Sequence, residues 1–192
     1  MPEAHDMKQL SDSKLYNDYL RGDNEAYDQL MIRYGDSLTL YLYGYLHDWH
    51  DAEDQMIETF ARIMVKRPRI GDGNFKAYLY KIGRNLAYRY YSKRHRVVEF
   101  SLDEYGDDSA GGELVEQSLI NDERRQVLHI CLDRIEPQLK EALWLVYFEE
   151  MSYREAADIM GVNTKRIDHL LTRGKRKLRE ELEKEGVTDA NG

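Results

Sequence analysis

A short segment rich in glycine, aspartate and serine interrupts the chain at residues 104–113, and it constrains the fold more than any other feature. The segment carries no lysine or arginine and lacks the apolar side chains that a core needs. We therefore expect a flexible acidic linker over residues 97–121. The linker separates a domain at residues 10–96 from a domain at residues 122–185, each long enough for a small helical bundle.

Both flanking parts have the sequence pattern of helices. Leucine, tyrosine, glutamate, lysine and arginine recur at three- and four-residue spacing, and only 3 prolines occur in 192 residues. No alternating strand pattern of useful length is present. We expect an all-α protein of two small helical domains, the C-terminal one containing a helix-turn-helix.

The formal net charge of -8 would by itself argue against a nucleic-acid partner. A polyanion responds to local charge, however, because the Debye length is only about 10 Å at 0.1 M salt. Residues 66–96 carry 10 basic and 1 acidic side chains, residues 165–179 carry 7 and 1, and residues 97–123 carry 9 acidic and no basic ones. Two basic blocks in an acidic background predict two local nucleic-acid surfaces.

Other features exclude several classes of protein. The single cysteine, Cys131, rules out an internal disulfide and a zinc site built from several cysteines. Its apolar helical neighbours indicate a buried core residue rather than a nucleophile. The first residues lack the pattern of a signal peptide, and nowhere do about 18 apolar residues occur together. We expect a cytoplasmic protein that does not insert into a membrane and has no cofactor, metal or catalytic residue.

In the first domain, Asp51 is expected to cap a helix whose buried stripe is Ile57, Phe60, Ala61 and Met64. The opposite face is then solvated or reserved for a partner, and it carries Asp54, Glu58 and Arg62.

Pro68 is expected to end this helix, and Asn74 to cap the next one after a glycine-rich turn. The second helix interleaves basic and aromatic side chains, a combination that suits the exposed bases of single-stranded nucleic acid. Alternatively, the tyrosines pack inside the bundle. We favour packing for Tyr78 and Tyr90, and both interpretations stay open for Tyr80 and Tyr88.

In the second domain, residues 153–171 have the pattern of helix, tight turn and helix. Ala157 permits close helix approach, Gly161 suits a left-handed turn, and Asn163 or Thr164 can cap a basic second helix. The start of such a helix reads bases in the major groove and its flanks hold phosphates. The expected base-facing residues are Thr164, Lys165, Arg166 and His169, and the expected backbone-holding residues are Arg173, Lys175, Arg176 and Lys177. The alternative is an amphipathic helix whose basic face is merely solvated.

Two His-Asp pairs, at His47 and His50, superficially resemble a metal-dependent phosphohydrolase site. Such a site needs further ligands from elsewhere in the chain, and the sequence supplies no second cluster. A corner between two helices is the favoured interpretation.

Taken in order, these segments resemble a bacterial RNA polymerase sigma factor of the extracytoplasmic-function (ECF) group of the sigma-70 family. The stretches that carry the resemblance are DAEDQMIETF at 51–60, FKAYLYKIGRNLA at 75–87, YFEEMSYREAADIMG at 147–161 and RGKRKL at 173–178. The resemblance implies a promoter-specificity subunit of RNA polymerase rather than an enzyme. A stand-alone helix-turn-helix regulator remains the alternative.

The resemblance also implies which residues bind which partner. Those implied to bind core polymerase, at the beta-prime clamp helices, are Asp51, Asp54, Gln55, Glu58 and Arg62. Those implied to recognise and open the promoter minus-10 element are Arg69, Asn74, Lys81, Arg84, Asn85, Tyr88, Arg89 and Lys93, with a flipped base captured by the loop at 69–75. Those implied to read the minus-35 element are Thr164, Lys165, Arg166, His169, Arg173, Lys175, Arg176 and Lys177.

Further partners implied by the resemblance are the beta flap of the polymerase and an anti-sigma factor that masks both binding surfaces.

The chain departs from the common family pattern at Asp168, His169 and Leu170. An aspartate beside the groove repels phosphate unless it accepts a hydrogen bond from cytosine or points outward, so the base preference stays open.

Overall fold

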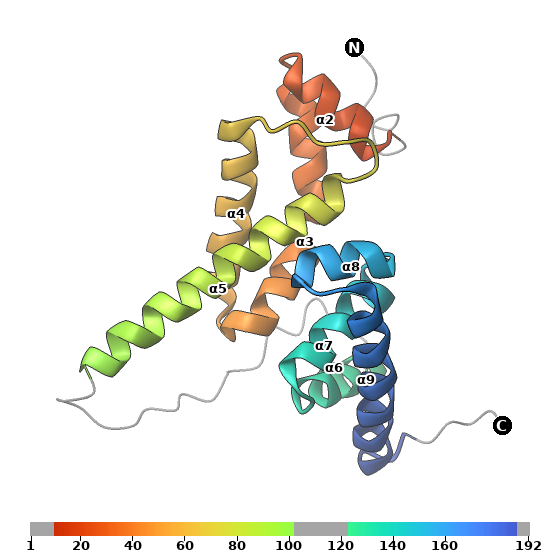
Figure 1. Cartoon of the computed structure of the whole chain (residues 1–192). Coiled ribbons are helices and arrows are strands. Elements are labelled where there is room, and N and C mark those ends of the chain that lie inside the picture. Colours follow the sequence, from red (N-terminus) through yellow and green to blue (C-terminus); the bar gives the residue numbers. More distant parts are fainter. Residues whose placement is uncertain (1–9, 102–122, 188–192) are drawn as a thin grey trace. The chain divides into compact units, whose positions relative to one another are not determined.

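The computed structural model describes residues 10–101 and 123–187 of the chain. All regular secondary structure within these residues is helical (Figure 1), which confirms the predicted all-α class. The chain divides into two compact units, Met1–Gly112 and Glu113–Gly192, and each is described by itself. Within the described ranges, no helix is both long and apolar enough to cross a membrane.

Four helices build the described part of the first unit: α2 at Asp12–Leu20, α3 at Asn24–Leu46, α4 at Trp49–Lys66 and α5 at Phe75–Ser101. Helix α3 packs against the other three, and α5 crosses α3 and α4 obliquely (Figure 1). The core lies between them. Its largest fully buried side chains include Tyr19, Tyr80, Phe60 and Phe75.

The C-terminal end of α4 is held by tyrosine hydroxyls from neighbouring helices. The hydroxyls of Tyr27, Tyr19 and Tyr16 donate to the carbonyl oxygens of Phe60, Met64 and Pro68, at 2.6, 2.8 and 2.8 Å. Proline has no backbone N–H, so residue 68 cannot donate to the Met64 carbonyl as the fourth residue along a helix normally would. Tyr19 supplies that missing donor.

Helix α4 begins at Trp49, and its N-cap is Asp48, whose side chain accepts a hydrogen bond from the Asp51 amide at 3.0 Å. The prediction of Asp51 as the cap is therefore wrong. His47, in the left-handed conformation, ends α3, and only His47 and Asp48 separate the two helices. The cap consequently falls three residues earlier than expected.

The predicted buried stripe of α4 is correct for Phe60 and wrong for Ile57 and Met64. The latter two are 54% and 45% exposed, whereas Thr59 and Ile63 are buried. Apolar residues occur on both faces of this helix. Two apolar stripes, on different sides of the helix axis, therefore fit the helical spacing equally well. The packing of α3 and α5 decides which stripe is buried.

The inner stripe of α5 includes Phe75, Leu79 and Leu86, which are buried. Gly83 permits the close approach of α3, because an added Cβ would lie 3.2 Å from Leu38 Cδ1. For Tyr80 and Tyr88 the sequence did not decide between packing in the core and exposure. Tyr80 is fully buried, whereas Tyr88 is 46% exposed.

Helix α5 continues to Ser101, into the stretch for which a linker was predicted from residue 97. No glycine or proline occurs between Gly83 and Gly106, so the change in composition at 97 does not end the helix. Residues 102–121 of the predicted linker lie outside the described residues.

The second unit contains α6 at Glu123–Asp133, α7 at Pro137–Leu143, the π-helical turn η1 at Trp144–Phe148, α8 at Tyr153–Met160 and α9 at Thr164–Lys184. Helix α9 packs against α6, α7 and α8. Cys131 is fully buried, as predicted, and burial raises the pKa of its thiol.

Helices α8 and α9 form the predicted helix-turn-helix. Ser152 and Glu155 make a reciprocal capping box at the start of α8, and Gly161 ends the helix at φ 68°. The Asn163 side chain then caps α9 by accepting from the Arg166 amide at 2.8 Å. Val162 lies in the turn between the two helices and is 37% exposed.

The buried tyrosines predict how stability depends on alkaline pH. Burial raises the pKa of Tyr16 to about 12 and also raises that of Tyr27. In the unfolded chain both hydroxyls ionise near pH 10, so the unfolded state loses protons first and stability falls as pH rises above about 10. The Tyr16→Phe, Tyr27→Phe double variant should be less stable at about pH 8 but should lose less stability between about pH 9 and 11. Denaturant unfolding across this range tests the prediction, and equal pH slopes for variant and parent would contradict it.

Candidate nucleic-acid interfaces

Helix α9 presents one continuous polar stripe away from its buried side. Ile167, Leu170 and Leu171 face the core. The residues at the centre of the opposite face recur at helical spacing and are exposed: Lys165, His169, Thr172 and Arg176. Thr172, whose hydroxyl donates to the Asp168 carbonyl at 3.0 Å, is absent from the sequence-based set. Once Ile167 is known to be buried, the 3.6-residue helical period places Thr172 on the exposed face of α9.

Two predicted cations, Arg173 and Arg166, lie on the edge of this stripe that faces the start of α7. The Arg173 guanidinium donates through Nη2 to both carboxylate oxygens of Glu136, each at 3.0 Å. Arg166 Nη2 donates to Gln138 Oε1 at 3.4 Å. Glu136 therefore compensates part of the positive charge beside the exposed face of α9.

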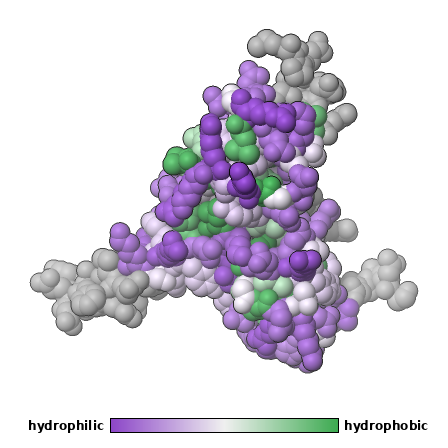
Figure 2. Space-filling model, turned by 45° about the horizontal axis from the view of Figure 1, so that its top comes forward, coloured by the Kyte–Doolittle hydropathy of each residue, from purple (hydrophilic) through white to green (hydrophobic). Residues whose placement is uncertain are grey.

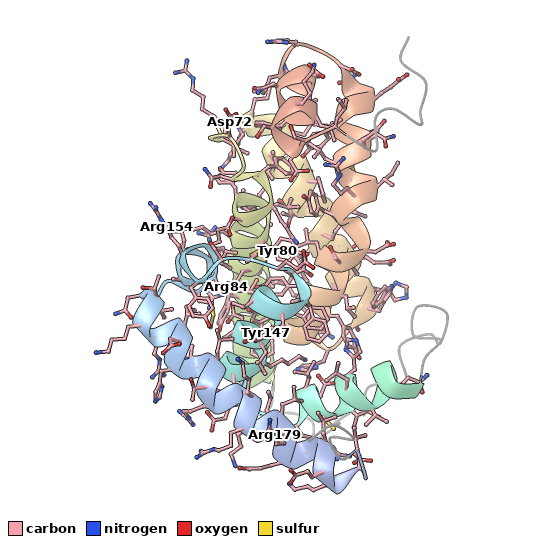
Figure 3. All side chains as sticks on the ribbon, turned by 90° about the vertical axis from the view of Figure 1, so that its right-hand side faces the viewer. Asp72, Tyr80, Arg84, Tyr147, Arg154 and Arg179 are labelled. Carbon is pink, nitrogen blue, oxygen red and sulfur yellow. The ribbon has the colours of Figure 1, made fainter. Side chains whose placement is uncertain are left out.

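The other edge of the stripe carries an aromatic contact. Lys175 Nζ lies 4.9 Å from the ring centroid of Tyr147, which belongs to η1, and hydrogen bonding to the Tyr147 hydroxyl raises the lysine pKa. Arg154 projects from α8 (Figure 3) and is exposed. Neither Tyr147 nor Arg154 was selected from the sequence, because no local pattern relates them to α9.

The basic residues of α9 therefore differ in how far neighbouring acidic groups neutralise their charge. Lys177 donates to Glu180 at 2.8 Å, and this hydrogen bond lowers the pKa of the glutamate. Arg176 Nε lies 3.8 Å from the same carboxyl group. The predicted Thr164, Lys165 and His169 are exposed. Arg176 and Lys177 thus share one carboxylate partner, whereas Lys165 and His169 lie at the exposed start of the stripe.

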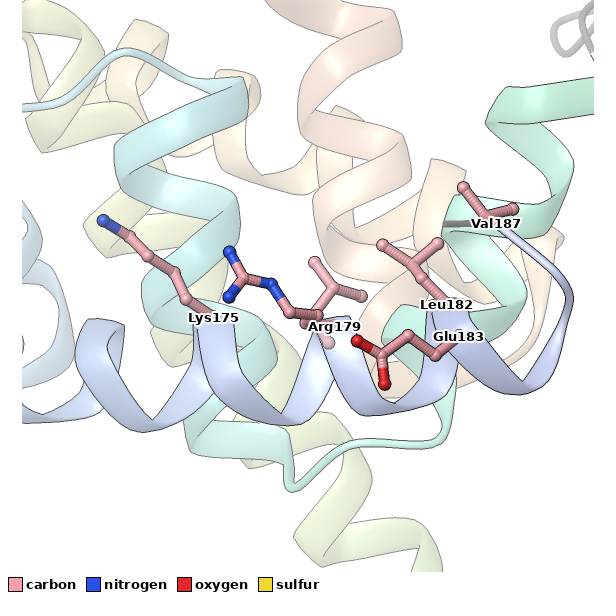
Figure 4. Close-up of a pocket in the computed structure, with 6 residues that line it drawn as sticks. Lys175, Arg179, Leu182, Glu183 and Val187 are labelled. Atoms are coloured by element: carbon pink, nitrogen blue, oxygen red, sulfur yellow. The ribbon is translucent and has the colours of Figure 1, made fainter. Parts of the chain in front are cut away.

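Beyond this stripe, a shallow pocket of about 260 Å³ runs along the C-terminal half of α9 (Figure 4). Its lining contains both signs of charge and apolar side chains: Lys175, Leu178, Arg179, Leu182, Glu183 and Val187. The mixed lining does not extend the basic surface.

Helix α5 carries the second candidate surface. Four predicted residues lie on the face opposite its buried stripe: Lys81, Asn85, Tyr88 and Arg89. The Arg84 guanidinium lies 4.7 Å from the Tyr88 ring centroid, and Figure 3 shows Arg84 on the same helix as the buried Tyr80. Lys93, near the end of the described side chains, is exposed.

An aromatic neighbour from α3 extends this surface. The rings of Tyr45 and Tyr88 lie 5.5 Å apart, and Tyr45 in turn contacts Tyr41, which packs on Tyr80. Sequence reasoning missed Tyr41 and Tyr45 because they lie about 40 residues before their partners. The tyrosine chain fixes the orientation of the exposed Tyr88 ring from the core outward.

The loop between α4 and α5, residues 67–74, presents Arg69 and Asn74, both exposed. The Asn74 carbonyl accepts the first backbone hydrogen bond of α5, from the Tyr78 amide at 3.0 Å, which agrees with its predicted place at the helix start. Gly73 has φ 77°, a conformation that favours glycine. Asp72, in this loop (Figure 3), is the only acidic residue of the basic block.

The outward face of α4 has a different character. Asp54 is exposed, Gln55 is half-buried, and Glu58 accepts a hydrogen bond from Arg62 Nε at 2.6 Å. Exposed hydrophobic side chains interrupt the hydrophilic surface of the molecule (Figure 2), and those on α4 are Ile57, Met64 and Val65. A mixed acidic and apolar face suits a protein partner better than a polyanion.

Asp51 lies apart from this face. It accepts a hydrogen bond from the Tyr90 hydroxyl at 2.6 Å and pairs with Arg94, both on α5. Because its carboxylate is used to hold α5, Asp51 is a weaker candidate for partner binding than Asp54 or Glu58.

His47 and His50 are both exposed, and His50 Nδ1 lies 3.9 Å from Glu53. Among the residues that the structure describes, no three His, Cys, Asp or Glu side chains gather as metal ligands would. The arrangement is that of a helix-helix corner.

Comparisons with known proteins agree with this division into two units. Residues 30–97 match the family described as Sigma-70 region 2, and residues 125–178 match Sigma-70, region 4. The chain is 28% identical over 167 residues to the ECF RNA polymerase sigma factor SigE of Mycolicibacterium smegmatis, covering 85% of this chain and 65% of SigE. It is 28% identical over 162 residues to the ECF RNA polymerase sigma factor SigM of Bacillus subtilis, covering 84% and 98%.

A solved structure is similar as well. The sigma factor RpoE of Bartonella quintana, determined in complex with the anti-sigma factor NepR, superposes with a TM-score of 0.65 at 25% identity. The match covers 82% of this chain and 96% of that one.

The Glu136–Arg173 pair generates a prediction about duplex DNA. Replacing Glu136 by Gln releases the Arg173 guanidinium and removes a repulsive charge beside the α9 stripe. The affinity of the full chain for duplex DNA should rise about three- to tenfold, and log K should depend on log salt with a slope steeper by about one. Glu185→Gln is the matched control, because Glu185 pairs with Arg134 at the C-terminal end of α9. Titrations at several salt concentrations test this, and equal effects of the two variants would contradict it.

Proposed function

The chain belongs to the sigma-70 family, in its ECF group, and we propose that it directs core RNA polymerase to specific promoters and helps to open them. As a sigma factor it would act by binding rather than by catalysis. The observation that carries the proposal is the presence of two physically different basic surfaces in one chain. One suits duplex DNA and the other suits exposed bases.

We assign the α9 stripe to the promoter minus-35 element. A helix-turn-helix places the start of its second helix in the major groove, and here that part carries Lys165, Arg166 and His169. Thr172 and Arg176 continue the same stripe, and Arg154 of α8 adds a cation near the groove edge. Glu136 would compete with phosphate for Arg173 and so moderate binding to unrelated DNA.

We assign the α5 surface and the 67–74 loop to the minus-10 element. Opening DNA exposes bases, and a base stacked on an aromatic ring gains about 1–3 kcal/mol. Tyr88 offers such a ring beside Arg84, while Lys81, Asn85 and Arg89 lie along the same helix face. The loop with Arg69 and Asn74 would hold a flipped base.

We assign the outward face of α4 to core polymerase, at the beta-prime clamp helices. Asp54, Glu58 and Arg62 supply charges, and Ile57 and Met64 supply the apolar area that a protein interface needs. The apolar residues add to the set implied by sequence resemblance. The beta flap would be contacted by the second unit.

Regulation by an anti-sigma factor is part of the proposal. The similar sigma factor RpoE was determined in complex with one, NepR. A protein that covers the α4 face would exclude polymerase by direct competition. The proposal places this chain in the cytoplasm, where polymerase and chromosome are found.

The experiment that tests the proposed function is transcription in vitro from a library of promoter fragments, with core polymerase and the full chain, followed by sequencing of the transcripts. Specific start sites that share two spaced elements would support the proposal. Their absence, with binding to duplex DNA retained, would favour a stand-alone helix-turn-helix regulator.

Charge reversal on α4 tests the polymerase assignment. Asp54→Lys with Glu58→Lys should lower the affinity for core polymerase at least about tenfold, because the face then opposes the charge of its partner. Binding of the free chain to duplex DNA should be unchanged or slightly tighter. Asp28→Lys with Asp36→Lys is the matched control, since both residues are exposed on α3 and the charge change is the same. Fluorescence titration with labelled core polymerase measures the effect, and equal losses in both variants would contradict the assignment.

A further inference from the structure

Helix α2 precedes the residues that match Sigma-70 region 2, and its side chains contact the loop at 67–74. The Tyr16 hydroxyl donates to the Pro68 carbonyl at 2.8 Å, near the start of the loop. The Ser13 hydroxyl accepts from the Gly73 amide at 2.9 Å, near its end. Two hydroxyls one helical turn apart on α2 therefore hold both ends of the same loop.

The C-terminal end of α4 and the first residue of the loop are held as well. Tyr19, one turn beyond Tyr16, donates to the Met64 carbonyl at 2.8 Å and accepts from Arg67 Nε at 3.3 Å. The Arg67 guanidinium also lies 5.0 Å from the Tyr19 ring centroid. Between the Tyr16 and Ser13 contacts, Arg69, Gly71 and Asp72 are exposed. The loop thus has fixed ends and an outward-facing middle.

Helix α2 can act as a rigid support because it is itself anchored to α3. Asp12, in its first turn, accepts hydrogen bonds from Arg33 and from the Tyr34 hydroxyl. Arg33 also donates to the Leu10 carbonyl at 2.8 Å. The ring of Phe75, the first residue of α5, lies 5.3 Å from Tyr16 and 6.2 Å from Tyr34. Loop, α2, α3 and the start of α5 therefore form one connected unit.

Rigidity of this loop has a functional consequence. A flexible loop that captures a flipped base loses conformational entropy when it binds the base, and this loss opposes promoter opening. A loop whose ends are already held binds the base without that loss. The contacts from α2 would then favour the open promoter while leaving the duplex-reading surface on α9 unaffected.

We propose that Ser13 and Tyr16 are positioning residues for promoter opening, which act by holding the 67–74 loop in its base-capturing conformation. The inference rests on the proposed function. It adds α2, a helix outside the two matched family regions, to the machinery of the minus-10 element.

The test uses the full chain with core polymerase and a promoter recovered from the transcription library, carrying 2-aminopurine in its minus-10 element. The variants are Ser13→Ala, Tyr16→Phe and their combination. Each single variant should slow the fluorescence rise that reports base unstacking about three- to tenfold, roughly what one hydrogen bond contributes. Affinities for core polymerase and for a minus-35 duplex should stay within about twofold of the parent.

Two controls separate positioning from stability. Tyr27→Phe removes an equivalent buried hydroxyl that donates to Phe60 of α4 rather than to the loop, so it should lower thermal stability without slowing opening. Ser13→Thr keeps the hydroxyl and should restore opening to nearly the parental rate.

The outcomes are distinguishable. Slower opening in the α2 variants, with parental rates in Tyr27→Phe and Ser13→Thr, supports the inference. Parental opening in the combined α2 variant, or equal slowing in Tyr27→Phe at equal thermal stability, would overturn it while leaving the proposed function intact. Absence of opening by the parent chain would instead overturn the proposed function.

Discussion

The end of helix α4 depends on hydrogen-bond donors that the helix itself does not supply. Pro68 removes the amide that would pair with the Met64 carbonyl, and Tyr19 of α2 replaces it. The Tyr27 hydroxyl donates to the Phe60 carbonyl, four residues before Met64, and the Tyr16 hydroxyl donates to the Pro68 carbonyl, four residues after it. Because the 67–74 loop and then α5 follow directly, these contacts position both the proposed base-capturing loop and the start of the basic helix. One set of buried hydroxyls therefore links the end of α4 to the loop that leads into α5.

The two basic surfaces, which we propose contact DNA, differ in their physical character. On α9, cations are partly paired with acids, as Arg173 is with Glu136 and Lys177 with Glu180. Such pairing weakens binding to arbitrary duplex DNA, where affinity comes mainly from phosphates. On α5, an aromatic chain from Tyr80 through Tyr41 and Tyr45 supports the exposed Tyr88. The net charge of -8 is compatible with both surfaces, because acidic residues lie beside the cations, on the separate face of α4 and in the sequence between the two basic blocks.

Much of the architecture follows from local sequence. The capping box at Ser152, the left-handed Gly161 and the Asn163 cap specify the helix-turn-helix without reference to the rest of the chain. The predictions that proved wrong, the cap and the buried stripe of α4, share a cause: two local arrangements fit the sequence equally well. Both Asp48 and Asp51 can cap α4, and the helix start is decided by where α3 ends. Likewise, Ile57 and Met64 fit a helical stripe as well as Ile63 does, and burial between α3 and α5 selects the stripe with Ile63.

By itself, the sequence determined the helical class, the division of the chain, the two basic blocks and the helix-turn-helix with its basic second helix. These properties depend on composition, on helical period and on short-range capping, all of which act within a few residues. Only the tertiary structure decided that Asp51 supports α5, that Glu136 holds Arg173, and that Ser13 and Tyr16 hold the 67–74 loop. Those contacts join residues 37 to 60 positions apart in the sequence, and no local pattern specifies which distant backbone or side-chain group a hydroxyl or carboxylate will reach.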